Sequence, residues 1–323
     1  MKYLCRGFFA VFSCILLTST MLEAEEVQAT IQTAVEVRFD AASVKTYEIQ
    51  ASTDLTTWMA VESGIIGQGA AVSRLYSTIN QPKRFFKVVV VPEFVTVAAG
   101  SLPSSSVLGT RSVATFQIAR TETTWVMWQT VRTWAVANGY DLADVGSGNG
   151  VNYPVTDVSW YHSVKWCNAR SEMEGLTPVY TVNGSIYRTG DSSPDVNASS
   201  NGYRLPSEAE WEFAARGGVN THGYDYSGSN DLNAVAWYYG NSGGASHSVA
   251  TMASNELGLC DMTGNVWEWC FEPIHSSDRV IRGDCWYFGA GDGLWLPISK
   301  SSYTDSYDRF NFLGIRVARS IVQ

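Results

Sequence analysis

The sequence predicts an α+β fold in which a small all-β module precedes a larger domain of helices, short strands and long loops. Three observations predict it. Residues 27–39 alternate β-branched and polar side chains, which is typical of a half-buried strand. Three later segments carry helix start and stop signals. Stretches 181–203 and 217–256 are rich in Gly, Ser, Asn and Tyr, and loops this long in a compact domain are functional or held by specific contacts.

The composition argues against nucleic acid as a general partner. The 323 residues carry a net charge of −9, and only 16 % of them are charged. Binding to phosphate backbones needs a cationic face, and the sequence shows none. The length allows one large domain or two smaller ones.

Residues 1–24 have the pattern of a signal peptide. Lys2 and Arg6 form a charged start, residues 8–17 are apolar, and residues 22–24 fit a cleavage tail. The apolar run is shorter than the roughly 20 residues that span a bilayer, so no transmembrane anchor is predicted. Cys14 leaves a lipoprotein as an alternative. The protein is expected to be secreted, periplasmic or on the cell surface.

Residues 25–93 predict a small β-sandwich. Short strand-like segments at 46–52 and 84–91 are separated by turn signals, without helical periodicity. The pattern is similar to a small β module of secreted proteins from environmental bacteria, for which a spacer or adhesion role is expected. The boundary to the larger domain, residues 94–323, is expected at Pro92-Glu93.

Three helices are predicted in the larger domain. Ser207-Glu-Ala-Glu210 forms a capping box, which makes the third helix the clearest. The predicted N-caps are Thr124, Ser159 and Ser207, and the predicted stops are Gly139, Gly175 and Gly217.

One carboxylate lies between two large rings. Glu268 is flanked by Trp267 and Trp269, directly after the turn-forming residues 263–265. A buried carboxylate needs a cation or several hydrogen-bond donors. Glu268 is therefore expected to bind a metal, to pair with an arginine, or to lie at the rim of the fold.

Four cysteines follow the signal segment, and they allow three complete disulfide pairings in an oxidising compartment. The pairing stays open. No CxxC motif is present and the four histidines are scattered, so no zinc site is predicted. The cysteines are Cys167, Cys260, Cys270 and Cys285.

Eight motifs in order resemble the formylglycine-generating enzyme (sulfatase-modifying factor) family over nearly all of residues 95–320. The resemblance implies a variant of the C-type lectin fold, with little regular structure and long fixed loops. The motifs are Glu122-Thr-Thr-Trp, Pro154 to Trp160, Val164 to Asn168, Tyr203 to Arg216, Asn255-Glu-Leu-Gly-Leu, Met262 to Trp269, Arg279-Val-Ile-Arg-Gly and Leu313 to Arg319.

Enzymes of this family oxidise a sulfatase cysteine to formylglycine, and the resemblance would imply a Cu(I) site made by two cysteine thiolates. The positions that correspond to those cysteines are Phe288 and Gly293, and no cysteine occurs between 286 and 323. Copper is therefore not expected, and no catalytic residue is assigned. A relocated Cys270/Cys285 copper pair stays as an alternative to buried thiols or a disulfide.

The calcium site of the family matches this sequence better than its copper site does. The resemblance implies ligation by the side chains of Asp261 and Glu268 and the carbonyls of Gly264 and Val266. Mixed side-chain and backbone oxygens suit a hard cation such as Ca²⁺. The alternative is that Glu268 pairs with Arg282 or Arg316.

Residues 284–312 are rich in aromatic residues, Ser, Gly and Asp. This composition is typical of binding surfaces, because rigid rings give contact area at low entropic cost. Family motifs flank the stretch, a layout similar to the variable proteins of diversity-generating retroelements. The expected ligand-binding residues are Trp286, Tyr287, Phe288, Asp292, Trp295, Tyr303, Tyr307 and Phe310.

The function predicted from the sequence is therefore an exported, non-catalytic protein that binds a protein or glycan. The alternatives are a formylglycine-generating oxidase, a drifted paralogue whose aromatic loop only packs, and a structural component of the cell surface. Neither the ligand nor the oligomeric state follows from the sequence.

Overall fold

The computed structural model describes residues 34–42, 45–67, 69–77, 83–275, 277–288 and 296–321. The predicted signal peptide and the predicted contact residues Asp292 and Trp295 lie outside these ranges. The chain divides into two compact units between Val91 and Pro92, and each unit is described by itself. No helix within the described ranges is long and apolar enough to cross a membrane.

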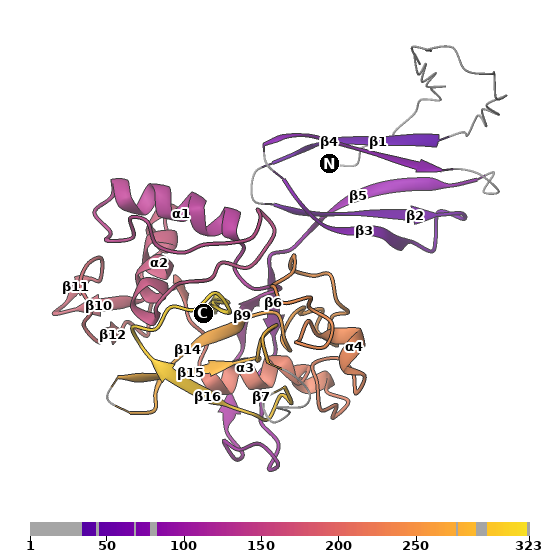
Figure 1. Ribbon diagram of the computed structural model, residues 1–323. Coiled ribbons are helices and arrows are strands. Elements are labelled where there is room, and N and C mark those ends of the chain that lie inside the picture. Colours follow the sequence, from indigo (N-terminus) through magenta and orange to yellow (C-terminus); the bar gives the residue numbers. More distant parts are fainter. Residues whose placement is uncertain are drawn as a thin grey trace, which may run out of the picture. The chain divides into compact units, whose positions relative to one another are not determined.

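The N-terminal unit consists of two antiparallel sheets (Figure 1). One pairs β1 with β4, and the other has the order β3-β2-β5. Side chains from both sheets form one apolar cluster that includes Val37, Tyr47 and Ile49. The strands are β1 (Ala34–Ala41), β2 (Thr46–Ser52), β3 (Met59–Ile66), β4 (Ala70–Ser77) and β5 (Phe85–Val91).

The three predicted helices are present in the larger unit, with the predicted N-caps. Thr124 accepts a hydrogen bond from the Met127 N–H, and both Ser159 and Ser207 form capping boxes. These side chains satisfy N–H groups that have no partner within a helix. The helices are α1 (Trp125–Ala137), α2 (Trp160–Met173), α3 (Glu208–Ala215) and α4 (Leu232–Val235), with a 3-10 turn η1 (Gly218–Asn220).

The strands of the larger unit are short. Those of the sheet β13-β18-β9-β6 are β6 (Phe94–Val97), β9 (Phe116–Ala119), β13 (Tyr203–Arg204) and β18 (Ala318–Ser320). Those of the sheet β16-β15-β14-β17 are β14 (Trp267–Pro273), β15 (Asp278–Arg282), β16 (Ser302–Asp305) and β17 (Leu313–Gly314). A two-stranded sheet pairs β7 (Gly100–Ser101) with β8 (Ser112–Val113), and a three-stranded sheet of the order β11-β10-β12 is formed by β10 (Tyr180–Val182), β11 (Ser185–Ile186) and β12 (Asp195–Val196).

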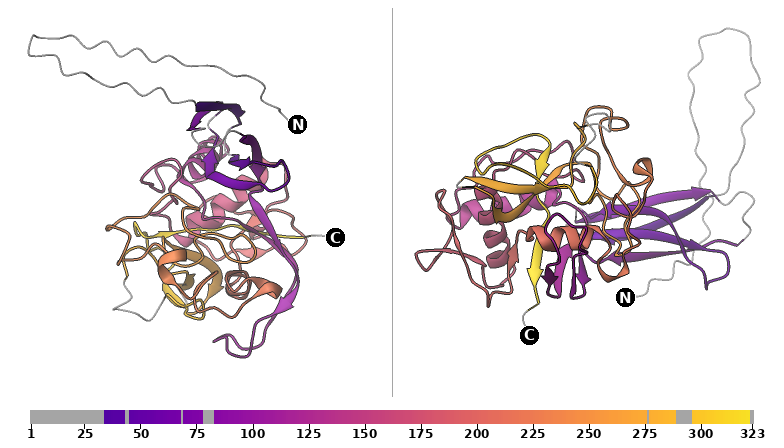
Figure 2. Two further views of the ribbon diagram at one scale, coloured as in Figure 1. Left: turned by 90° about the vertical axis from the view of Figure 1, so that its right-hand side faces the viewer. Right: turned by 90° about the horizontal axis from the view of Figure 1, so that it is seen from below.

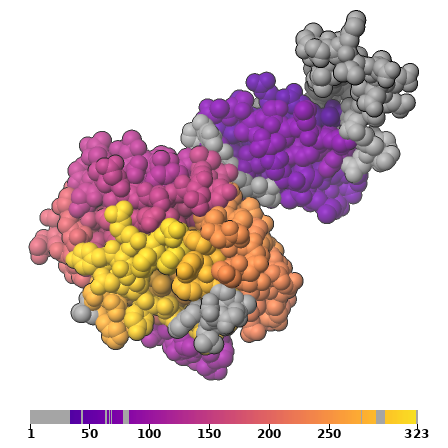
Figure 3. Space-filling view, viewed as in Figure 1, coloured from indigo at the N-terminus to yellow at the C-terminus, as the bar shows by residue number. Residues whose placement is uncertain are grey.

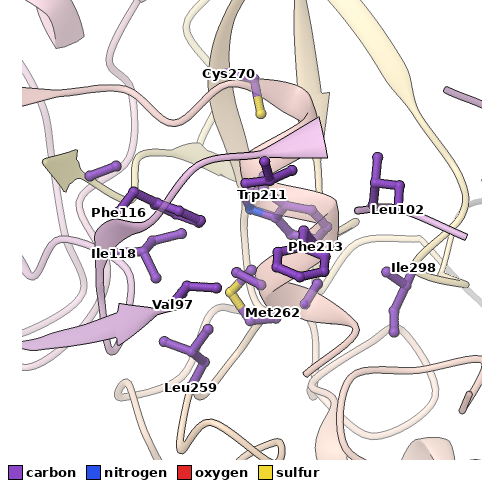
Figure 4. Packing of buried hydrophobic residues seen from close by; sticks show 14 of the residues in the cluster. Val97, Leu102, Phe116, Ile118, Trp211, Phe213, Leu259, Met262, Cys270 and Ile298 are labelled. Carbon is purple, nitrogen blue, oxygen red and sulfur yellow. The ribbon is translucent and has the colours of Figure 1, made fainter. Parts of the chain in front are cut away.

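Long loops connect these elements, and Figure 2 shows how little of the orange and yellow part of the larger unit is regular structure. The interior is formed by apolar side chains from loops, strands and α3 together. Trp211 and Phe213 of α3 lie beside Met262, Cys270 and Ile298 in one buried cluster (Figure 4). The fold is α+β, as predicted, and the loops are fixed because they contribute to this core.

Candidate functional site

The turn before Glu268 brings three distant segments together. Gly264 has φ 80°, and a Cβ atom added to it would lie 2.3 Å from the Trp237 carbonyl oxygen, so only glycine fits. The Gly264 N–H donates to the Gly283 carbonyl (2.7 Å), and the Asn265 N–H donates to the Trp237 carbonyl (2.8 Å). This turn therefore joins the loop around 237, the start of β14 and the end of β15.

Glu268 is completely buried and forms an ion pair with Arg316. Its Oε1 accepts hydrogen bonds from Arg316 Nη2 (2.7 Å) and Nε (3.0 Å), and its Oε2 accepts one from Trp211 Nε1 (2.6 Å). Arg282 pairs instead with Glu208 and Glu212 on α3. Of the roles open for Glu268, the structure thus shows pairing with an arginine, and that arginine is Arg316.

Two further buried carboxylates, Glu122 and Asp261, interact electrostatically with this pair. The Glu122 carboxylate accepts hydrogen bonds from Asn265 Nδ2 (3.0 Å) and the Val266 N–H (3.3 Å). Burial and the negative charges of Asp261 and Glu268 raise the pKa of Glu122 well above its usual range. Burial likewise raises the pKa of Asp261 to about 6. Three carboxylates therefore share one positive charge, that of Arg316.

Asp261 suits a hard cation better than Glu268 does. Asp261 Oδ2 accepts a hydrogen bond from the Ala250 N–H (2.7 Å), whereas its buried Oδ1 has no partner. Both oxygens of Glu268 face donors instead. Within the described ranges, no three acidic, histidine or cysteine side chains converge on one point that would suit a metal. The predicted calcium site, with Gly264 and Val266 as carbonyl ligands, stays a prediction.

The aromatic residues before and after β16 form a group that we call the aromatic cluster: Trp286, Tyr287, Phe288, Phe310 and Phe312. Phe310 and Tyr287 both stack on Phe312, with ring centroids 4.9 and 5.8 Å apart and interplanar angles of 12° and 11°. Phe288 packs edge-on against Phe312 at 5.9 Å. Segments more than 20 residues apart in the chain therefore make one continuous set of rings.

The predicted contact residues differ in how far they reach solvent. Tyr287 is 54 % exposed and Phe310 36 % exposed, whereas Trp286 is buried. The Trp286 N–H donates to the Asn265 carbonyl (2.8 Å), which fixes the cluster to the turn before Glu268. Tyr303 and Tyr307 are exposed but make ring contacts with His275 and Tyr161, outside the cluster.

Sequence reasoning missed three residues of these sites. Phe312 is the centre of the aromatic cluster; it lies in the predicted aromatic stretch 284–312 but was not among the expected ligand-binding residues. Tyr239 is exposed, and its N–H donates to the Phe288 carbonyl (3.0 Å). Glu122 was seen only as part of a motif, and its polar neighbours Thr121, Thr123 and Thr124 gave no signal that it would be buried. Figure 3 shows that residues 296–321, in yellow, form much of the visible face of the larger unit.

All four cysteines in the described ranges are buried free thiols. Burial raises the pKa of Cys260 to about 11 and raises the pKa values of Cys167, Cys270 and Cys285 further. Cys270 lies in the apolar core beside Trp211 (Figure 4). Such thiols stay protonated at neutral pH, whereas metal ligation and nucleophilic attack need the thiolate.

Comparison with known proteins identifies the scaffold. The family model described as "Sulfatase-modifying factor enzyme 1-like domain" matches residues 81–321. A protein from Paenibacillus barcinonensis named "Chaperone protein LppX" is 32 % identical over 240 residues, which are 65 % of this chain and 81 % of that protein. "Inactive C-alpha-formylglycine-generating enzyme 2" from Bos taurus is 29 % identical over 158 residues, 44 % of this chain and 42 % of that protein.

Two solved structures share the fold. The crystal structure of CarF superposes with a TM-score of 0.62 at 27 % identity, covering 71 % of this chain and 98 % of CarF. Treponema denticola variable protein 1 superposes with a TM-score of 0.56 at 27 % identity, covering 70 % of this chain and 94 % of that protein. The family model spans most of the chain and these structures have the same fold, so the chain belongs to the sulfatase-modifying factor (formylglycine-generating enzyme) family.

Proposed function

We propose that this protein is an exported ligand-binding protein that presents the aromatic cluster on a sulfatase-modifying factor scaffold and has no formylglycine-generating activity. The observation that carries the proposal is the cluster itself. Tyr287, Phe310 and Phe312 form three nearly parallel rings, two of them exposed, and Phe288, at the position of the first of the family's paired cysteines, packs edge-on against Phe312.

The chemistry of the remaining thiols supports a non-catalytic role. Cys270 and Cys285 are each completely buried, and burial holds both as neutral thiols. Soft thiolates are what select Cu(I). One similar protein is named an inactive formylglycine-generating enzyme, and another is a variable protein. These names agree with a scaffold that is used for binding.

The activity test incubates the purified protein with Cu(I) and a sulfatase peptide containing Cys-x-Pro-x-Arg. We expect no aldehyde in the product by mass spectrometry. Copper-dependent conversion of the peptide cysteine to formylglycine would show that the protein is an oxidase and would overturn the proposal.

The binding test applies the protein to a glycan array and to a displayed peptide library. We expect binders whose affinity falls at least tenfold, about 1.4 kcal/mol, in the double variant Y287A/F310A. Trp58→Ala is the matched control, because Trp58 is a half-buried ring of the N-terminal unit that packs on Lys87. Equal loss in both variants, or no loss in either, would remove the cluster as the binding surface.

Whether the cluster is diversified is a separate question that the neighbouring DNA answers. A template repeat of the segment encoding residues 284–312, next to a reverse-transcriptase gene, is expected if it is. If neither the template repeat nor the reverse-transcriptase gene is found, the protein would still be proposed to bind a ligand, but a single fixed one. Export is tested on the protein itself, by finding a mature N-terminus after Ala24.

Calcium is proposed as a structural ion at Asp261, whose buried Oδ1 has no partner. A ligand that binds only the native state stabilises it by mass action, by about 2.7 kcal/mol at a hundredfold excess over Kd. Chelation is therefore expected to lower the melting temperature of the wild type, and Asp261→Asn should abolish the response. An unchanged melting temperature in chelator would end this proposal.

A further inference from the structure

Arg279 is a buried cation without a counter-ion in the described part of the chain. Four arginines there are less than 5 % exposed, and the other three each contact at least one carboxylate. Burying a charge is costly unless it is paired, so Arg279 is the exception that needs a partner. The three paired arginines are Arg170, Arg282 and Arg316.

The guanidinium of Arg279 is held in one place by its neighbours. It lies over the Trp160 ring, 4.4 Å from the ring centroid. Its Nη1 donates to the Asp278 carbonyl (3.1 Å) and its Nη2 donates weakly to Ser193 Oγ (3.3 Å). Its Nε is buried and has no acceptor. One donor of a fixed, planar cation is thus left unused.

A second buried polar atom without a partner belongs to a neighbour of Trp160. Trp160 is the first residue of α2, and its N–H donates to the Ser306 carbonyl (3.1 Å). Ser306 is completely buried, and its Oγ has no hydrogen-bond partner. Buried polar groups are almost always satisfied, so two such atoms around one residue point to a group that the chain itself does not supply.

Lys165 near the N-terminal end of α2 is already paired with Asp141 and Asp191, so the buried positive charge that is left unpaired there, among the described residues, is that of Arg279. The N-terminus of a helix carries partial positive charge, which favours anions, although the Trp160 and His162 N–H groups of α2 already donate to the Ser306 carbonyl and to Ser159 Oγ. Burial lowers the pKa of His162 in the first turn of α2 to about 4; the charges of Lys165 and Arg309 add to this shift, and those of Asp191 and Asp141 oppose it. Arg309 is exposed and makes no ion pair with any described residue, while its Nε donates to the Asp157 carbonyl (2.8 Å).

We propose that Arg279, Ser193 and Ser306 at the N-terminal end of α2 bind the oxyanion group of a ligand, a carboxylate, phosphate or sulfate. A guanidinium donates to such groups in charge-assisted hydrogen bonds, and a serine hydroxyl adds a neutral donor. Tyr307 follows Ser306 directly, is 56 % exposed and lies 5.0 Å from the Tyr161 ring, so a ligand held here also reaches a predicted contact residue. The site deepens the proposed binding function.

The test measures binding of three simple anions to the full-length protein at constant ionic strength: inorganic phosphate, sulfate and acetate, each replacing chloride. Calorimetry of the wild type is expected to show saturable binding of at least one of them, and the preferred anion identifies the chemical group. Ser306→Ala should weaken that binding about tenfold, because it removes one donor to a charged group.

Thr123→Val is the matched control, because Thr123 Oγ1 is another buried hydroxyl without a partner. It should leave anion binding unchanged. Neither variant is expected to lose stability, since each removes a hydroxyl that makes no hydrogen bond. Arg279→Lys keeps the charge but not the planar fork, and it too should weaken binding about tenfold.

Absence of saturable binding for all three anions would overturn the proposal, as would equal binding by Ser306→Ala and wild type. If Arg279→Lys fails to fold, the serine variant still decides. The double variant Y287A/F310A should retain anion binding. Failure of this site is therefore distinguishable from failure of the aromatic cluster.

Discussion

The ion pair of Glu268 with Arg316 and the aromatic cluster are both attached to the segment around the start of β14, yet they are built in opposite ways. At the ion pair, Arg316 also donates to the carbonyls of Ala119 (3.0 Å) and Cys260 (2.8 Å), so directional bonds fix the geometry. In the cluster, Phe310 and Tyr287 contact Phe312 through their ring faces and remain open to solvent. Ring contacts tolerate substitution far better than a buried charge does.

Backbone hydrogen bonds connect the two regions without coupling their side chains. The Trp286 N–H donates to the Asn265 carbonyl, and the Trp267 N–H donates to the Phe312 carbonyl, both at 2.8 Å. A change of side chain in the cluster leaves these bonds in place. The difference teaches that this scaffold separates the residues that maintain the fold from those that are free to change.

The largest effect is expected from breaking the ion pair. Arg316→Met leaves Glu268 as an unpaired buried charge near Glu122 and Asp261, and we expect a loss of about 3–5 kcal/mol in the free energy of unfolding, measured in urea. Arg319→Met is the control, because Arg319 is half-buried and makes no ion pair with any described residue. Similar losses in both variants would mean that the pair is not the stabilising feature.

The next largest effect on the free energy of unfolding is expected from the ionisation of Asp284, and it depends on pH. It is 2 % exposed, and burial raises its pKa to about 7. The folded state therefore holds this proton more tightly than the unfolded state, whose pKa is about 3.9. The contribution of Asp284 to stability should therefore fall as the pH rises from 4 to 7 and stay level above, with a total change below about 4 kcal/mol.

Asp284→Asn should flatten that pH dependence and stabilise the protein at pH 8. Asparagine tolerates the left-handed backbone at this position, where φ is 63°. Denaturation at several pH values measures both effects. If the free energy of unfolding depends on pH between 4 and 7 equally in the variant and the wild type, the titrating group would be Glu122 or Asp261 instead.

Removing one hydrogen bond to the ion pair should cost less. Trp211→Phe keeps the packing of an aromatic ring on α3 but loses the Nε1 donor to Glu268, and we expect a loss of about 1.5–3 kcal/mol by urea denaturation. A loss below about 0.5 kcal/mol would indicate that Arg316 alone satisfies the carboxylate.

The smallest effect is expected in the aromatic cluster. Tyr287→Ala removes an exposed ring, so the free energy of unfolding should change by less than about 1 kcal/mol while ligand affinity falls. Thermal denaturation and binding are measured on the same preparation. A stability loss as large as that of Trp211→Phe would show that the cluster maintains the fold, against the separation drawn here.

Local signals were sufficient for the helices. Thr124, Ser159 and Ser207 cap α1, α2 and α3 because a cap depends on residues within one turn of each other. The family motifs predicted the scaffold, and the position of Glu268 between two tryptophans predicted that it needs a partner. The sequence could not decide whether Glu268 binds a metal or an arginine. Arg316 is 48 residues away from Glu268, and only folding brings the two side chains together.

Which residues of the aromatic stretch are exposed and which are buried could likewise not be predicted from the sequence. Trp286 and Tyr287 are neighbours with the same predicted role, yet one is buried and the other exposed, because their side chains point in different directions from a loop without regular period. The anion-binding proposal at Arg279 depends on contacts from α2, β15 and the loop around Ser193. No spacing in the sequence connects those three segments.

The four buried thiols have a consequence for biogenesis. In an oxidising compartment, each cysteine is protected only while the core is closed around it. In the proposed export the chain would cross the membrane before its core has closed, and its thiols would then have ordinary reactivity towards oxidants and towards one another. The yield of native protein would thus depend on a kinetic competition, in which the core must close faster than mispaired disulfides form.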